Sequence, residues 1–387
     1  MAKKSFFNIV DYGTSNIRVS IYNSELIEKF SETYTNLLNE RNLDQLNVLT
    51  NIIKKAEKKI SSHIEDLIVI LDSKQMFVID LCLNKNLEKK SKISQVYETL
   101  LLELNQLIEI NYNQLYINHV ILNNCIINKK KFNSLPESNQ EISNIKISFK
   151  LICYPRKLIN SIKSNFAKNN LNINNIFCAS YLKTLTYLRN LNNPKVCFLE
   201  IGWERTSLII YDNSKLKYIK SIPIGSFHIT KDISKIFKIS LEDAEKIKKS
   251  FNKTETEFSY NNNYNLENMT VKEILNKNIS TDTLKRVILY RVQEIIDLSF
   301  KNINLEYKKI NLKNSDLFLI GGGSILFDNN SFYLDDKFEF NSINFYNEKD
   351  SEICNSGLIY YMNNYELPKK TKKNQGIFER FFNFFGK

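Results

Sequence analysis

The chain has 387 residues, of which 43% are hydrophobic, and this combination suits two lobes with separate cores and excludes a disordered chain. The net charge is +12, but the lysines are scattered, so we expect no nucleic-acid partner. The six cysteines contain no Cys-x-x-Cys pair and the three histidines lie far apart, which argues against disulfides and metal clusters. No apolar run is long enough to cross a bilayer, so any membrane contact would be peripheral.

The first motif is a polar turn between two predicted strands, residues 6–10 and 17–22. A carboxylate in such a turn can hold a hydrated divalent cation, and the neighbouring N–H and O–H groups can bind phosphate. The residues concerned are Asp11, Gly13, Thr14, Ser15 and Arg18. An ordinary N-terminal hairpin remains the alternative.

A second copy of this arrangement lies in the middle of the chain. Apolar runs at 196–201 and 206–211 flank a tight turn, which predicts another hairpin. Glu200, Gly202 and Thr206 supply the acid, the glycine and the hydroxyl. Alone, such a hairpin is commonly only a turn; the repetition favours a phosphate site.

Between the hairpins, the sequence predicts a helix near 48–60, a strand at 67–71 and then a compact inserted module. This module would consist of short strands around a helical segment, with no chemistry of its own. We predict its strands at 76–83, 119–127 and 145–153, and its helix at 93–110.

Three further segments could bind a ligand. A strand that enters Gly225 before a helix can cradle an anion at the helix start. A helix at 241–248 places Glu245 and Lys248 one turn apart, although such pairs are commonly surface features. A buried strand at 317–320 opens into Gly321, Gly322 and Gly323, which permits close approach to a flat ligand or forms a mobile turn.

The C-terminal tail carries its own pattern. A polar linker with four lysines precedes six large apolar residues that share one helical face. This pattern favours an interfacial membrane helix over a core helix, with the lysines attracted to anionic lipid. The apolar residues are Ile377, Phe378, Phe381, Phe382, Phe384 and Phe385, and the lysines are Lys369, Lys370, Lys372 and Lys373.

Taken together, the motifs resemble those of the actin/Hsp70/sugar-kinase superfamily and, within it, the FtsA family of cell division proteins. The resemblance rests on residues 10–15, 200–202, 221–233, 243–248 and 320–323. It implies an α/β, actin-like, two-lobed fold with a five-stranded mixed sheet in each lobe and an FtsA-type inserted subdomain 1C. ATP and Mg²⁺ would bind between the lobes, with Asp11 and Glu200 holding the metal through water.

The resemblance also implies subdomain boundaries. Subdomain 1A would comprise 1–72, 156–187 and 350–366; 1C 73–155; 2A 188–239 and 303–349; 2B 240–302; the linker 367–375; and the membrane helix 376–387.

The implied function is to polymerise in an actin-like way and to tether the FtsZ ring to the cytoplasmic face of the inner membrane at the division site. Partners would be the FtsZ C-terminal tail, further copies of the chain, anionic lipids and other division proteins. Trp203, Glu204 and Arg205 replace glycines of the family's second phosphate loop, so we expect weak ATP binding and at most a weak ATPase, with Arg205 offsetting the added negative charge. A PilM-like pilus assembly protein and a sugar-kinase-like phosphotransferase are the alternatives.

Overall fold

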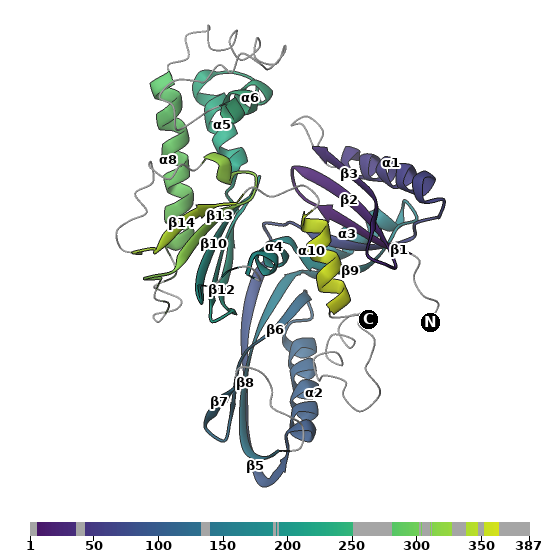
Figure 1. The fold of residues 1–387 in the computed structure, drawn as a ribbon, viewed down its shortest axis with the longest axis vertical. Coiled ribbons are helices and arrows are strands. Elements are labelled where there is room, and N and C mark those ends of the chain that lie inside the picture. The colour runs from purple at the N-terminus through teal and green to yellow at the C-terminus, as the bar shows by residue number, and fades with distance from the viewer. Residues whose placement is uncertain are drawn as a thin grey trace.

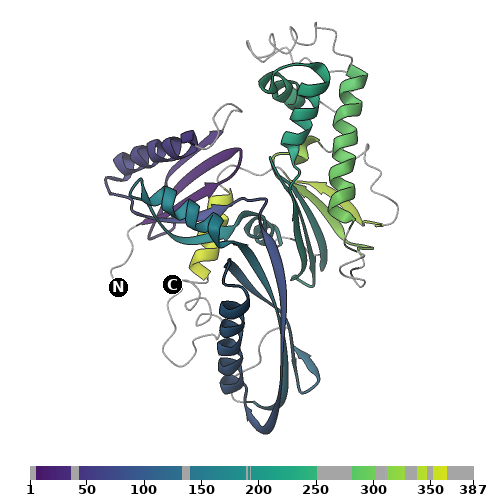
Figure 2. The same ribbon diagram turned by 180° about the vertical axis from the view of Figure 1, so that it is seen from behind.

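The structure is a computed structural model that describes residues 6–35, 43–132, 140–188, 191, 193–250, 281–301, 303, 310, 312–326, 338–346 and 352–363. It contains two five-stranded sheets and one four-stranded sheet. Figures 1 and 2 show the two five-stranded sheets in separate lobes, with the third sheet extending away from both. Two lobes with five-stranded mixed sheets are what the family resemblance implies, and this expectation is confirmed.

The first lobe is built on the sheet β3-β2-β1-β4-β9. Strands β1 to β3 are antiparallel, whereas β4 and β9 run parallel to β1. The bounds are β1 Phe6–Tyr12, β2 Asn16–Asn23, β3 Glu28–Thr35, β4 Asp66–Leu71 and β9 Asn172–Cys178. Helices cover both faces of this sheet, namely α1 Leu43–Ile60, α3 Arg156–Ala167, α4 Ala179–Leu188 and α10 Glu352–Tyr361.

The second lobe repeats this topology in the order β12-β11-β10-β13-β14. Again three antiparallel strands are followed by two parallel ones, so β10 is the counterpart of β1. The strands are β10 Lys195–Ile201, β11 Thr206–Asp212, β12 Lys215–Ile222, β13 Asp316–Ile320 and β14 Ser342–Phe345. One face is covered by α5 Ser226–Phe237, α6 Leu241–Ser250 and α8 Thr281–Phe300 (Figure 1).

The inserted module forms the third sheet, which is antiparallel in the order β5-β8-β6-β7. Its strands are longer than the sequence predicts, and one helix packs on the sheet. The elements are β5 Phe77–Lys92, α2 Ile93–Asn111, β6 Leu115–Ile127, β7 Lys130–Phe132 and β8 Glu141–Pro155. The subdomain boundaries expected from the resemblance stay predictions.

Alternate side chains of the central strands enter different cores, because successive residues of a strand point to opposite faces. Val196 and Phe198 of β10 pack in a cluster that also contains Val10 and Val69 of the first lobe. Cys197 and Leu199 face the helices of the second lobe. One core therefore continues across both lobes. Within the described ranges, no helix has the length and apolar character needed to span a bilayer.

Helix α4 lies between the two five-stranded sheets (Figure 1). Its polar contacts join hydroxyl groups: Ser180 Oγ lies 3.2 Å from Ser207 Oγ, and Thr184 Oγ1 lies 2.7 Å from Tyr211 Oη. On the side of the first lobe, Thr186 Oγ1 lies 2.6 Å from the Ser356 hydroxyl of α10. Helix α4 thus contacts both lobes, and hydroxyl groups supply part of these contacts.

His119 of β6 joins the third sheet to the first lobe. Its Nε2 accepts a hydrogen bond of 2.8 Å from the backbone N–H of Cys178, so the proton of the neutral ring lies on Nδ1. Nδ1 lies 3.0 Å from Tyr360 Oη and donates to it. Burial lowers the pKa of His119 to about 3. The junction therefore requires the neutral imidazole.

We predict that replacing His119 by Gln flattens the dependence of stability on pH. Because the folded-state pKa lies below the ordinary value of 6.5, the contribution of His119 is complete above pH 6.5 and is lost as the pH falls toward 3. Between pH 6.5 and 5 this one group accounts for about 2 kcal/mol of unfolding free energy. Urea unfolding of the unmodified chain and of His119→Gln at pH 7 and pH 5 measures this difference. If both proteins lose the same unfolding free energy between the two pH values, the prediction is wrong.

Candidate functional site

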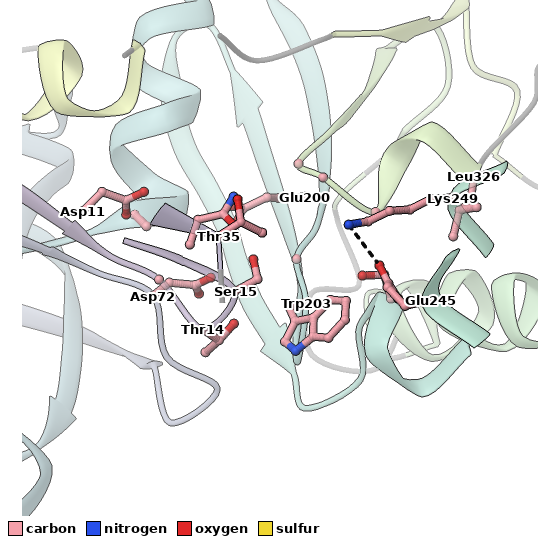
Figure 3. A pocket seen from close by; sticks show the side chains of 18 of the residues that line it. Asp11, Thr14, Ser15, Thr35, Asp72, Glu200, Trp203, Glu245, Lys249 and Leu326 are labelled. Carbon is pink, nitrogen blue, oxygen red and sulfur yellow. Dashed lines mark ion pairs between the residues drawn. The ribbon is translucent and has the colours of Figure 1, made fainter. Parts of the chain in front are cut away.

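A cavity of about 510 Å³ lies between the two lobes, within the size range of small-ligand sites. Figure 3 shows Asp11, Thr14 and Asp72 on one side and Glu245 on the other, with Trp203 between them. The cavity collects segments that are far apart in sequence. The predicted residues that line it are Asp11, Gly13, Thr14, Ser15, Arg18, Glu200, Gly202, Glu245, Lys248, Gly321, Gly322 and Gly323.

The other two predicted residues, Thr206 and Gly225, do not line the cavity. Thr206 Oγ1 donates 2.8 Å to the carbonyl of Ile224, and a Cβ on Gly225 would lie 2.6 Å from the carbonyl oxygens of Gly202 and Trp203. Both residues pack against the segments around the second loop without lining the cavity. The backbone N–H groups of Ser226 and Phe227 also donate to this loop, at 2.9 and 2.8 Å. These two donors at the start of α5 are therefore not available to the anion that the sequence led us to expect there.

The two hairpins present equivalent loops to the cavity. Tyr12 pairs with Ile17 and Ile201 pairs with Thr206, so each loop contains four residues. In both loops the N–H of the first residue donates to the carbonyl of the fourth: Gly13 to Asn16 at 3.1 Å and Gly202 to Arg205 at 2.8 Å. By this register Asp11 corresponds to Glu200, and Asn16 corresponds to Arg205.

The first loop has an unsatisfied donor. Thr14 Oγ1 is buried and lacks a hydrogen-bond partner in the described structure, although it lies at the cavity. A buried hydroxyl without a partner is costly, so a ligand oxygen at this position would be favourable. Asp11 at the end of β1 is bonded to Arg18 Nη1 at 2.7 Å. Burial raises the pKa of Asp11, and the Arg18 guanidinium opposes this shift.

The second loop holds a buried ion network. Arg205 is 2% exposed and binds Glu200 through Nη1 at 3.0 Å and Asp72 through Nε. Lys183 of α4 lies 3.0 Å from the other oxygen of Glu200. Burial would raise the pKa of Glu200, but Arg205 and Lys183 outweigh it and hold the pKa below its ordinary value. The carboxylates also keep Arg205 protonated, since they raise its pKa against the effect of burial.

Glu245 and Lys248 form a buried pair on the opposite wall, not a surface pair. Their side chains lie 2.6 Å apart, and Lys248 is 4% exposed. Burial lowers the pKa of Lys248, and Glu245 opposes this shift. Lys248 Nζ lies 4.8 Å from the ring of Trp203, which stacks on Phe227 at a centroid distance of 4.8 Å. The ring of Trp203 is therefore held by contacts with both a cation and an aromatic ring.

The glycine loop approaches β10 very closely. Gly321 has φ +89°, and a Cβ there would lie 2.6 Å from the carbonyl oxygen of Ile201. A Cβ on Gly323 would lie 2.6 Å from the Ile201 side chain. Gly322 has no atom within 4 Å of its Cβ position, so it presents an open backbone face. The loop thus forms a cavity wall that packs closely against the end of β10.

Asp72 and Lys183 are among the cavity residues that were missed in the sequence. Asp72 directly follows the apolar run at 67–71, much as Asp11 follows the run at 6–10, and this parallel could have revealed it. Lys183 lies on α4, a helix that the apolar periodicity did not indicate. The membrane-binding residues predicted in the tail, from Lys369 to Phe385, lie outside the described residues and stay predictions, as do residues 251–280 of the expected subdomain 2B.

We predict that Gly321→Ala destabilises the protein by about 1–3 kcal/mol, because alanine disfavours the positive φ and its methyl group contacts Ile201. Gly322→Ala is the matched control and should change stability by no more than about 0.5 kcal/mol. Urea unfolding measures both variants. Equal stabilities would show that the loop relaxes away from β10.

Two five-stranded sheets of the same topology, with a cavity between the ends of their central strands, define the actin-like ATPase fold. A solved structure described as a PilM-PilN type IV pilus biogenesis complex supports this class. It aligns with a TM-score of 0.55 and 12% identity, over 90% of this chain and 89% of that one. At this identity the similarity concerns the fold alone.

Residues 197–362 match the family model described as "Cell division protein FtsA". Proteins of that name from Neisseria meningitidis serogroup B and Buchnera aphidicola are 27% and 30% identical, each over 131 residues, 34% of this chain and 31% of the relative. The chain thus aligns with about a third of the length of these curated relatives. The resemblance to the cell division protein FtsA, expected from the sequence, is confirmed by these matches.

Proposed function

We propose that this chain is an FtsA-type division protein that binds nucleotide between its lobes and tethers FtsZ polymers to the inner face of the cytoplasmic membrane. The observation that carries the proposal is the FtsA match over residues 197–362, which include the second phosphate loop, the buried Glu245–Lys248 pair and the glycine loop. The membrane half of the proposal rests on the pattern of the tail.

The chemistry of the cavity fits a nucleoside polyphosphate. The buried Thr14 hydroxyl without a partner and the basic side chains of Arg18 and Lys183 lie on the phosphate side. The open backbone of Gly322 and the Glu245–Lys248 pair would contact the nucleoside. Bound Mg²⁺ would neutralise phosphate charge, but the carboxylates expected to hold it, Asp11 and Glu200, are already bonded to cationic side chains. The donor set therefore does not fit the metal, and we derive no hydrolytic step.

We predict that Thr14→Val weakens binding of ATP and ADP about fivefold, because the hydroxyl would donate to a ligand oxygen. The same change should leave the stability of the ligand-free protein equal or higher, since the hydroxyl has no partner there. Trp203, the single tryptophan of the chain, lines the cavity, so its fluorescence reports binding. The control is Thr99→Val on the exposed face of α2, which should not alter affinity. An unchanged affinity for Thr14→Val would contradict this role.

The tail would provide a reversible anchor. Full burial of each large apolar side chain contributes about 1.5–3 kcal/mol, which interfacial depth reduces. Ordering a short helix opposes binding, whereas each nearby lysine adds about 1 kcal/mol at an anionic surface. One tail would therefore bind modestly. Copies linked in an actin-like filament would bind far more firmly, because the effective concentration of the second and later tails is high.

We predict that Phe381→Glu releases the full-length protein from vesicles that contain anionic lipid, since it places a charge on the apolar face. Asn383→Glu makes the same change of charge on the polar face and should retain most binding. Vesicle flotation measures the bound fraction of each protein. Equal flotation of Phe381→Glu and the unmodified chain would exclude the tail as the anchor.

The FtsZ partner is inferred from the resemblance, with the FtsZ tail docking on the expected subdomain 2B at residues 240–302. Helices α6 and α8 are the described parts of this region. Adding purified FtsZ to the flotation assay tests the tether directly: FtsZ should float only with an intact tail. If the chain floats but the added FtsZ does not, the membrane anchor is supported and FtsZ is excluded as its partner.

A further inference from the structure

Each of the three carboxylates on the phosphate side of the cavity is already paired with a cation of the protein. Asp11 is bonded to Arg18 at 2.7 Å, Glu200 to Lys183 at 3.0 Å, and Asp72 to Arg205. Arg205 also binds Glu200 at 3.0 Å. Three negative and three positive side chains thus neutralise one another within the lobes.

Arg205 is buried, is not among the residues that line the cavity, and connects the two lobes. Asp72 follows β4 of the first lobe, whereas Glu200 lies near the end of β10 in the second. A guanidinium group is planar and can bond two carboxylates at once, and it stays charged when buried. Arg205 therefore holds these two carboxylates together across the junction of the lobes.

A hydrated magnesium ion has little to bind here. Mg²⁺ takes an octahedral shell of oxygen atoms that includes carboxylates and phosphates, and it retains several waters. In the described part of the chain no three His, Cys, Asp or Glu side chains are grouped so that they could hold a metal ion. A divalent ion would also have to displace Arg18, Lys183 or Arg205 from these carboxylates before it could bind them.

We propose that Arg205 takes the place of the divalent cation, so that the cavity binds nucleoside di- and triphosphates without a metal ion. This inference rests on the nucleotide-binding part of the proposed function. Arg18 and Lys183 line the cavity and would contact the phosphate groups. Arg205 would neutralise Glu200 and Asp72, to which it is bonded. The altered second loop would then keep the phosphate site but use the Arg205 guanidinium in place of a divalent metal ion.

The first hairpin supplies the variant that tests the proposal. Asn16 occupies the loop position that corresponds to Arg205, so asparagine is compatible with this turn. Arg205→Asn leaves Glu200 and Asp72 without their shared cation and should create a need for Mg²⁺. The control is Lys74→Ala, which removes an exposed pair with Glu204 at 3.7 Å at the same junction without touching the cavity.

The experiment is a titration of the full chain with ADP and ATP, in EDTA and in Mg²⁺, followed by Trp203 fluorescence. We expect the affinities of the unmodified chain and of Lys74→Ala in the two buffers to differ by less than about threefold. For Arg205→Asn we expect Mg²⁺ to tighten binding about tenfold.

The outcomes separate the inference from the function. Affinity of the unmodified chain that rises about threefold or more with Mg²⁺ would overturn the inference and leave nucleotide binding intact. Binding in neither buffer would overturn nucleotide binding itself. If Arg205→Asn does not fold, the comparison of the two buffers with the unmodified chain decides the matter alone.

Discussion

The contact between Arg205, Asp72 and Glu200 is the constraint on which the arrangement of the lobes depends. Removing a charged side chain from water costs several kcal/mol, so a buried ion is tolerated only when its partners remain in place. Asp72 and Glu200 belong to different lobes, and Arg205 is 2% exposed. Any opening that separates the lobes must therefore break the contact of Arg205 with Asp72 or with Glu200 and provide that charge with water or a new partner.

The two lobes share a plan, but their cavity loops differ in side chains at three of four positions, since residues 13–16 are Gly-Thr-Ser-Asn and residues 202–205 are Gly-Trp-Glu-Arg. Both sheets have the same strand order and directions, and both hairpins close with four-residue loops of matching register. The first loop retains small polar side chains and a hydroxyl without a partner, as a phosphate site needs. The second loop carries Trp203 and Arg205, which fill space and neutralise acids. The two loops on the phosphate side of the cavity therefore have equivalent backbones but different side-chain chemistry.

Much of the fold could be predicted from sequence where local pattern and burial agree. Both hairpins, the inserted module and the strand before Gly321 have clear periodicity or turn residues, and the structure contains all of them. Helices α4 and α10 were missed because both are buried on most sides and lack the polar face that marks a surface helix. The part played by Arg205 could not be predicted, since sequence offers no sign that Asp72 lies beside it. We expected Arg205 to offset negative charge at the second loop, and it does bond to carboxylates. Its partners, however, are Asp72 and Glu200 inside the protein, and Arg205 itself does not line the cavity.

The hydroxyl contacts of helix α4 have a mechanical consequence. A hydroxyl hydrogen rotates to follow its acceptor, so contacts such as Ser180 with Ser207 and Thr184 with Tyr211 tolerate small shifts of their partners. Interlocked apolar side chains would resist the same shifts. These hydroxyl contacts would therefore allow α4 and the second sheet to shift slightly against each other, whereas the Lys183–Glu200 ion pair and the stacking of Tyr187 on Phe198 set the limit of that shift.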